Sequence, residues 1–218
     1  MEVVASSSNY NNKDSDRSRM ADVICEFLEV SFNLILYVRS VYPDGIFRKS
    51  RKYNVAVMMS RHPELNKYIC DVLTGINALI SAGNVERVTL QINTKDNEPI
   101  ERFVFELRLF EGSGNDEMTL NRVCEIEQCL RDLLLKINNC DAVLQPLPED
   151  CTFSVTVQTK ESVANELMKN DQFEGFPWIR AESSDNTASL QKSSIYPLKS
   201  CNMHNLKIQC FVERVKMK

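Results

Sequence analysis

The stretch that decides the fold runs from Ala21 to Ile76 and reads ADVICEFLEVSFNLILYVRSVYPDGIFRKSRKYNVAVMMSRHPELNKYICDVLTGI. Its first part predicts a helix over about 21–40 whose apolar residues point in nearly every direction: Val23, Ile24, Phe27, Leu28, Val30, Phe32, Leu34, Ile35 and Leu36. A helix without a polar face must be surrounded by other elements. We therefore expect a fold organised around one central helix, with its functional surfaces on the elements that cover it.

The rest of this stretch predicts a turn, a short strand and a second helix. Tyr42-Pro43-Asp44-Gly45 has the residues of a turn. The densest basic cluster, 48–52, is interpreted as a solvated loop, with nuclear import and phosphate contact as the alternatives. Alternation over 55–59 predicts a short strand, and apolar residues at three- and four-residue steps predict a helix over about 62–82.

Beyond this stretch, strands and helices are again predicted in separate runs. Alternating apolar residues predict strands at 85–92, 103–109, 152–158 and 206–212, and an apolar face predicts a helix over about 118–139. Separate runs of helices and antiparallel strands are typical of the α+β class. Residues 1–20 are polar and offer little to bury, so they are predicted to be a disordered tail.

Composition argues against several classes of protein. The 218 residues carry a net charge of −4, whereas a free-standing nucleic-acid binder is usually basic on one face. Strong direct binding to nucleic acid is therefore not expected. Glu26, Glu29 and Arg39 interrupt the most apolar run, so no membrane span is predicted. The polar N-terminus has no apolar signal core, which argues against secretion.

The side chains that usually carry catalysis or bind metals have no convincing arrangement. The chain has 8 cysteines but no Cys-x-x-Cys pair, and neither of its 2 histidines stands at ligand spacing from a cysteine pair. The cysteines are interpreted as reduced thiols that serve as small apolar core residues. No nucleophile motif or nucleotide loop is present. We predict a protein that is not an enzyme and that needs no metal or cofactor.

Collinear words along the chain resemble the HORMA-domain family, and within it the accessory subunits of translesion DNA polymerase zeta. They are CEFLEV at 25–30, LILYVR at 34–39, VYP at 41–43, GIF at 45–47, KYNV at 52–55, HPELN at 62–66, FVFE at 103–106, CDAVL at 140–144, CTF at 151–153, FPWI at 176–179 and PLK at 197–199. The resemblance implies one HORMA domain over 21–218: three helices on an antiparallel-rich sheet, a core to about residue 160 and a mobile "safety belt" over about 161–218.

The resemblance also implies a set of partners. The belt of a HORMA domain wraps a short peptide that has joined the sheet edge, and the family's pocket residues correspond to Tyr68 and Trp178. The peptide would be a proline-bearing segment of the polymerase zeta catalytic subunit. Tyr68 on its own also fits a core residue with its hydroxyl at the rim, whereas a lone Trp in a poorly periodic region suits an interface hot spot as well as a core.

A second surface, corresponding to Ile195, Gln209 and Phe211, would receive a translesion scaffold protein, a deoxycytidyl transferase. The family pattern has Leu and Tyr where this chain has Ile195 and Phe211, so a hydrogen bond from a Tyr hydroxyl would be lost here. Self-association, or association with other HORMA proteins, would use Arg131 and Ala142. The implied function is a nuclear, non-catalytic adaptor in DNA damage tolerance. The alternative is a HORMA subunit of a DNA-end-protection or cell-cycle regulatory complex.

Overall fold

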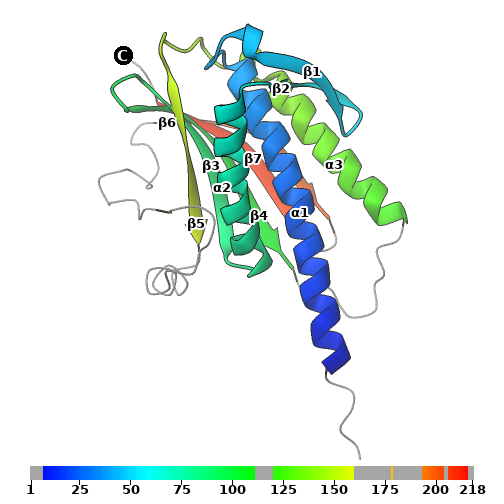
Figure 1. Ribbon diagram of the computed structural model, residues 1–218. Helices are drawn as coiled ribbons and strands as arrows, with labels where there is room; N and C mark the ends of the chain where they lie inside the picture. Colours follow the sequence, from blue (N-terminus) through cyan, green and yellow to red (C-terminus); the bar gives the residue numbers. More distant parts are fainter. Residues whose placement is uncertain (1–6, 111–119, 160–177, 179–192, 204–205, 216–218) are drawn as a thin grey trace, which may run out of the picture.

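The computed structural model of the chain describes residues 7–110, 120–159, 178, 193–203 and 206–215. Most of the predicted belt, 160–177 and 179–192, lies outside these residues. Three helices, α1 (Ser7–Val38), α2 (Pro63–Ser81) and α3 (Leu120–Asn138), lie on one face of a 5-stranded sheet (Figure 1). The predicted α+β class is confirmed. As predicted, α1 is central, and it packs against both of the other helices.

The start of α1 differs from the sequence-based prediction, because residues 7–20 continue the helix instead of forming a disordered tail. Two contacts hold its early turns. Met20 is buried beside Ala21 in the core, and the guanidinium of Arg17 lies against Gly83, just beyond the end of α2. The polar composition of this segment hid these anchors. Residues 1–6 lie outside the described part of the chain.

The large sheet is antiparallel throughout and has the strand order β5-β3-β4-β7-β6. Its strands are β3 (Val85–Asn93), β4 (Pro99–Leu109), β5 (Thr152–Thr159), β6 (Ser193–Asn202) and β7 (Leu206–Val215). The strands predicted at 85–92, 103–109, 152–158 and 206–212 are confirmed. The sequence did not predict β6, which contains Pro197 and has no regular alternation of apolar and polar residues. An edge position explains it, because an edge strand tolerates a proline that a central strand would not.

The core lies between the sheet and α1. On β4, Phe103, Phe105 and Leu107 face the helices and pair with Val212, Cys210 and Ile208 of β7, and all six are at most 4% exposed. Phe105 meets Phe27 and Phe32 of α1 edge to face, with ring centroids 6.1 and 6.2 Å apart. Such aromatic contacts and the buried area fix α1 against the centre of the sheet.

The basic cluster lies in a strand, not in the predicted loop. Residues 47–52 form β1 (Phe47–Lys52), which pairs with β2 (Val55–Ser60) in a separate 2-stranded hairpin. The turn between them is made by Tyr53 and Asn54, which have left-handed φ angles of 48° and 56°. Asn tolerates this conformation, whereas a bulky Tyr adopts it rarely. The polar run 48–52 did not look like a strand because the one buried residue of β1 is Phe47, which comes before the run.

A buried ion cluster ties the C-terminal strand to the core. Glu101 of β4 is fully buried and accepts hydrogen bonds from Arg39 Nε and Nη2, each at 3.0 Å, and from Arg214 of β7. Arg39 and Arg214 also donate to the backbone carbonyl of Gln145. The cluster therefore joins the end of α1, two strands and the loop after α3.

Candidate functional site

The predicted peptide pocket falls on α2 and the edge strand β5. Tyr68 of α2 lies edge to face with Phe153 of β5, at a centroid distance of 5.6 Å, and Tyr42 meets the same ring at 6.2 Å. Burial raises the pKa of Tyr68, while a backbone hydrogen bond with Val155 of β5 and the nearby Tyr42 act as smaller influences. Tyr68 thus links the helix to the backbone of the edge strand and presents a half-buried aromatic surface.

The side chain of Trp178 packs against the same helix, α2. Its indole ring covers Gly75, where the side chain of any other residue would begin only 2.6 Å from indole Nε1. Gly75 follows Tyr68 by two helical turns, a separation of about 10 Å along the axis. The two predicted pocket residues therefore share one side of α2. Both are half-buried and pack against the core.

Strand β5 ends the sheet on this side. It pairs with β3 along residues 152–159, and within the described part of the chain its other edge carries no strand. Such an edge presents unpaired backbone N–H and C=O groups, which can bond to an additional strand. The aromatic rings of Tyr42, Tyr68 and Phe153 lie beside it.

The three residues of the predicted scaffold surface share one face of the sheet. Ile195 pairs with Glu213, so it lies on the same side of the β6–β7 ladder as Gln209 and Phe211. This face points away from the core, because Ile208, Cys210 and Val212 point inward. The side chains differ in exposure: Ile195 is 63% exposed and Phe211 only 8%.

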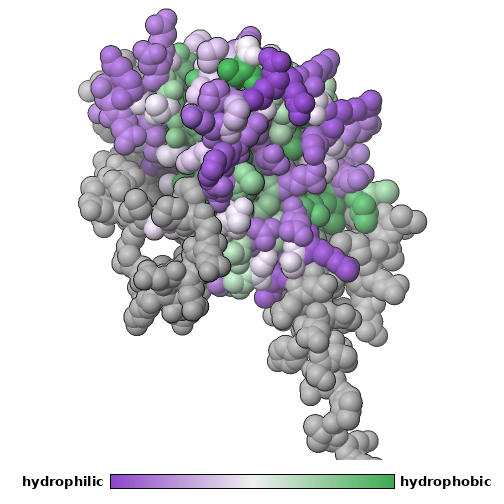
Figure 2. Space-filling view, in the orientation of Figure 1, coloured by the Kyte–Doolittle hydropathy of each residue, from purple (hydrophilic) through white to green (hydrophobic). Residues whose placement is uncertain are grey.

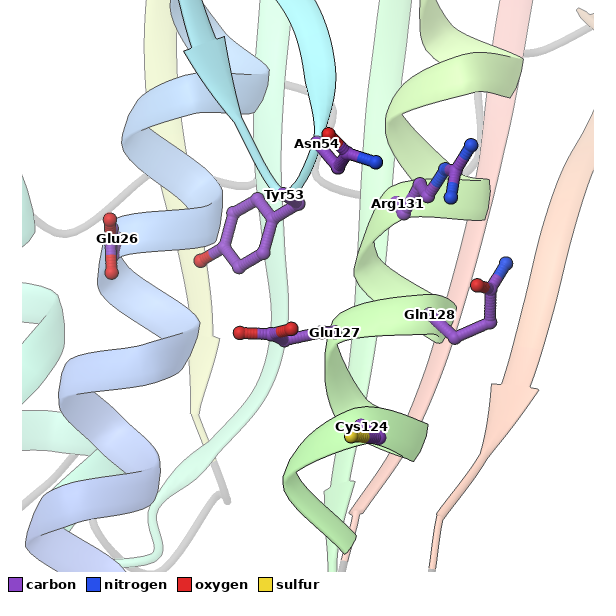
Figure 3. Close-up of a pocket in the computed structure, with 7 residues that line it drawn as sticks. All are labelled: Glu26, Tyr53, Asn54, Cys124, Glu127, Gln128 and Arg131. Carbon is purple, nitrogen blue, oxygen red and sulfur yellow. The ribbon is translucent and has the colours of Figure 1, made fainter. Parts of the chain in front are cut away.

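Arg131 lines a separate open hollow of about 510 Å³ (Figure 3). The hollow lies between α1, the hairpin turn and α3, and its other lining residues are Glu26, Tyr53, Asn54, Cys124, Glu127 and Gln128. Glu127 extends from α3 toward the ring of Tyr53. Burial, with smaller influences from Glu26, Glu127 and Glu29, raises the pKa of Tyr53. Ala142 lies apart from this hollow, exposed at the end of the short helix Cys140–Ala142.

The outer surface of the helical layer is mostly hydrophilic. In the view of Figure 2, hydrophilic residues cover most of the surface, and hydrophobic ones gather in a few places, the clearest at the right-hand edge beside the grey atoms. In the described ranges no three His, Cys, Asp or Glu side chains gather where they could hold a metal ion. Among the same residues, no helix is both long enough and apolar enough to cross a bilayer.

Comparison with known proteins identifies the family. The HORMA domain model matches residues 21–170. The chain belongs to the HORMA domain family. This confirms the predicted family and fold. The HORMA domain family is non-catalytic, so the prediction that the chain is not an enzyme is confirmed as well.

Proteins of similar sequence match this chain over nearly its whole length. It is 44% identical to the Homo sapiens mitotic spindle assembly checkpoint protein MAD2B over 89% of this chain and 90% of that protein. It is 29% identical to the Arabidopsis thaliana DNA polymerase zeta processivity subunit, over 93% and 90%. Among solved structures, a chain of the mitotic checkpoint complex matches with a TM-score of 0.74 and 22% identity, over 89% and 98%. This last likeness shows a shared fold.

Sequence reasoning missed two contacts of the candidate pocket and one buried ion cluster. It did not pair Trp178 with Gly75, although an isolated glycine inside a helical pattern often marks a close packing contact. It did not place Phe153 and Tyr42 beside Tyr68. It also had no signal for the ion cluster around Glu101, because the cluster joins residues far apart in the chain.

Proposed function

We propose that this HORMA domain is a non-catalytic adaptor of DNA polymerase zeta. In this proposal it clamps a proline-bearing peptide of the catalytic subunit and bridges that subunit to a translesion scaffold deoxycytidyl transferase. The observation that carries the proposal is the edge of β5, beside Tyr68, Phe153 and the Trp178–Gly75 contact. The names of its relatives in plants and in Drosophila melanogaster, which are 29% and 28% identical, support the polymerase assignment.

In the proposed complex the peptide joins β5 as a further antiparallel or parallel strand. Backbone hydrogen bonds along the edge would provide affinity, and pockets for alternate side chains would provide specificity. A proline suits such a peptide at a position whose nitrogen faces away from the sheet, because it has no N–H to donate. Its ring would pack on the aromatic side chains of Tyr68 and Trp178.

Bridging requires a second binding surface away from β5. The β6–β7 hairpin, at the other end of the strand order, would provide it. Ile195 offers exposed apolar area, and Gln209 offers an amide that can donate and accept hydrogen bonds. The two edges of the sheet are separated by β3, β4 and β7. Peptide and scaffold could therefore bind at the same time. Such a role in DNA damage tolerance places the protein in the nucleus.

A second function is suggested by the relatives named as mitotic spindle assembly checkpoint proteins. The same clamp would then serve a cell-cycle regulatory or DNA-end-protection complex by holding a different peptide. The two functions differ in the partner and not in the mechanism of capture.

The test is a titration of a proline-bearing peptide from the polymerase zeta catalytic subunit. Trp178→Ala should weaken binding by about 2–4 kcal/mol, as buried aromatic anchors do, which is roughly 30- to 1,000-fold. Phe110→Ala is the matched control, because Phe110 is an aromatic residue that is 51% exposed just beyond β4. Equal affinities of wild type and a folded Trp178→Ala variant would reject the clamp.

A further inference from the structure

Two cysteines meet where α3 packs against β6. The thiol of Cys201 on β6 donates a hydrogen bond to the backbone carbonyl oxygen of Cys129 on α3, with Sγ 3.6 Å from that oxygen. Cys201 is buried and only 3% exposed, whereas Cys129 is partly open to solvent. The thiol of Cys129 can thus be reached from solvent, whereas the neighbouring thiol of Cys201 is buried.

A β-bulge brings Cys201 to this position. The pairing of β6 with β7 shifts between Pro197 and Lys199, after which Lys199 lies opposite Cys210 and Cys201 opposite Ile208. Cys210 and Ile208 point toward the helices. Without the extra residue, Lys199 and Cys201 would point to the outer face, because a shift by one residue turns every later side chain over.

Lys199 completes the same junction. Its ammonium group pairs with Asp132 of α3 at 3.2 Å, and its positive charge acts to lower the pKa of Cys201. A nearby cation favours the thiolate form of a cysteine, which is the form that reacts with disulfides. Burial and the neighbouring Cys129 act in the opposite direction on Cys201 and raise its pKa to about 12. The partly exposed Cys129 is therefore the better first point of attack.

We propose that Cys129 and Cys201 are a redox-active pair that a small-molecule disulfide, such as glutathione disulfide, converts into an intramolecular disulfide. The Cys129 thiolate attacks one sulfur of glutathione disulfide, forms a mixed disulfide and releases one glutathione thiolate. Cys201 then loses its proton as its sulfur attacks the sulfur of Cys129, and the departing second glutathione thiolate takes up a proton. Two protein thiols are oxidised to one disulfide, one glutathione disulfide is reduced to two thiols, and the two protons lost by the cysteines end on the two glutathione thiols.

The disulfide would attach β6 covalently to α3 across 72 residues of chain. A cross-link that closes a long loop stabilises the folded state chiefly by restricting the unfolded chain. It would also keep the β6–β7 hairpin from leaving α3. If the proposed clamp is correct, oxidation would then slow the release of a captured partner.

The experiment uses the full chain without any partner, so its result does not depend on the proposed clamp. The reduced protein is incubated in a series of glutathione redox buffers, and its cysteines are mapped by mass spectrometry of digested peptides. We expect a peptide pair linked through Cys129 and Cys201. The thermal unfolding midpoint should rise by about 5–15 °C over the reduced protein.

Three variants sharpen the result. Cys201→Ser should stop at the first step and accumulate glutathione on Cys129, and Cys129→Ser should form no link. Cys124→Ser is the matched control, because Cys124 is an exposed cysteine of the same helix, and it should cross-link like wild type. Cys124 also shows that the oxidant has acted. If it becomes glutathionylated in wild type while no Cys129–Cys201 link forms, the proposal is overturned.

Discussion

The indole of Trp178 occupies the space that a side chain at Gly75 would need, with Nε1 2.6 Å and Cε2 3.2 Å from the position of the missing Cβ. A real Cβ essentially never approaches another atom that closely, so any other residue at 75 would displace the ring. Gly75 is fully helical within α2. Its conformational freedom is not needed there, and the close contact explains why a glycine occupies the middle of a helix.

Gly75→Ala should therefore separate binding from stability. Alanine favours a helix interior over glycine by about 0.8–1.0 kcal/mol, so α2 itself should not be weakened. The displaced Trp178 should nevertheless weaken capture of the polymerase zeta peptide by about tenfold or more, because hot-spot aromatic residues act only in their pockets. Isothermal titration and urea unfolding of the same samples measure the two effects.

The control for this variant is Thr74→Ala, at an exposed position one residue earlier in the same helix. It should leave peptide affinity unchanged. If Gly75→Ala binds the peptide as tightly as Thr74→Ala does, the position of Trp178 over α2 does not matter for capture.

The second prediction concerns the carboxylate of Glu101, which is buried between two arginines. Glu101→Gln would remove the buried counter-charge of Arg214 and leave Arg39 with only the exposed carboxylate of Asp141, 2.6 Å from its Nη1. Breaking a buried ion pair in this way costs about 3–5 kcal/mol. We expect a loss of that size in the free energy of urea unfolding. Amide hydrogen exchange should also become faster in β7, because Arg214 anchors this strand to Glu101.

Asp71→Asn is the comparison for Glu101→Gln. Asp71 pairs with Lys67 at 2.6 Å on the surface of α2, where the lysine side chain is 76% exposed. Exposed pairs within one helix contribute only about 0.3–0.5 kcal/mol. Equal and small effects of the two substitutions would show that the cluster around Glu101 does not hold the fold.

The elements that the sequence predicted are those with a strong local pattern. The helix expected over 62–82 begins at Pro63, with His62 before it, and ends at Ser81. The alternation at 85–92 marks β3 almost to the residue. In α2 the apolar stripe is the buried face, and in β3 the apolar residues Val88, Leu90 and Ile92 are fully buried and alternate with polar ones, so hydrophobic periodicity reports the structure directly.

The features that escaped prediction depend on contacts between distant residues. Strand β1 is polar and lies in a two-stranded hairpin outside the main sheet, and β6, at the end of the strand order, contains Pro197 and an irregular mixture of polar and apolar residues. The meeting of Cys129 and Cys201 depends on a bulge between Pro197 and Lys199, which no periodicity shows. The candidate clamp was located through family resemblance, and Gly75 and Phe153 were found only in three dimensions.

The third prediction concerns the proposed scaffold surface, where exposure decides which variant is informative. Ile195→Ala should weaken scaffold binding with little change in stability, because its side chain is 63% exposed. Phe211→Ala should also lower the free energy of unfolding by about 3 kcal/mol or more, since a buried phenylalanine leaves a cavity. Gln209→Ala combined with Phe211→Ala should abolish scaffold binding while peptide capture persists in the folded fraction.

Competition distinguishes two surfaces from one. Labelled peptide and scaffold domain are added together to the wild-type protein, and both should be retained in one complex during size-exclusion chromatography. Mutual displacement of peptide and scaffold would show that they share a site, and the bridging function would then be wrong.

The fourth prediction concerns self-association through the hollow that Arg131 lines. Glu26 and Glu127 lie in the same hollow, so a two-fold axis there would set each arginine against carboxylates of the other copy. The planar guanidinium can bond to several such acceptors at once. Arg131→Ala should therefore convert a dimer into a monomer without lowering the thermal unfolding midpoint.

The control variant is Lys136→Ala, at an exposed position in the last turn of the same helix, and it should remain dimeric. Analytical ultracentrifugation of the peptide-bound protein measures both, and a wild type that stays monomeric well above micromolar concentration would leave Arg131 no interface to serve.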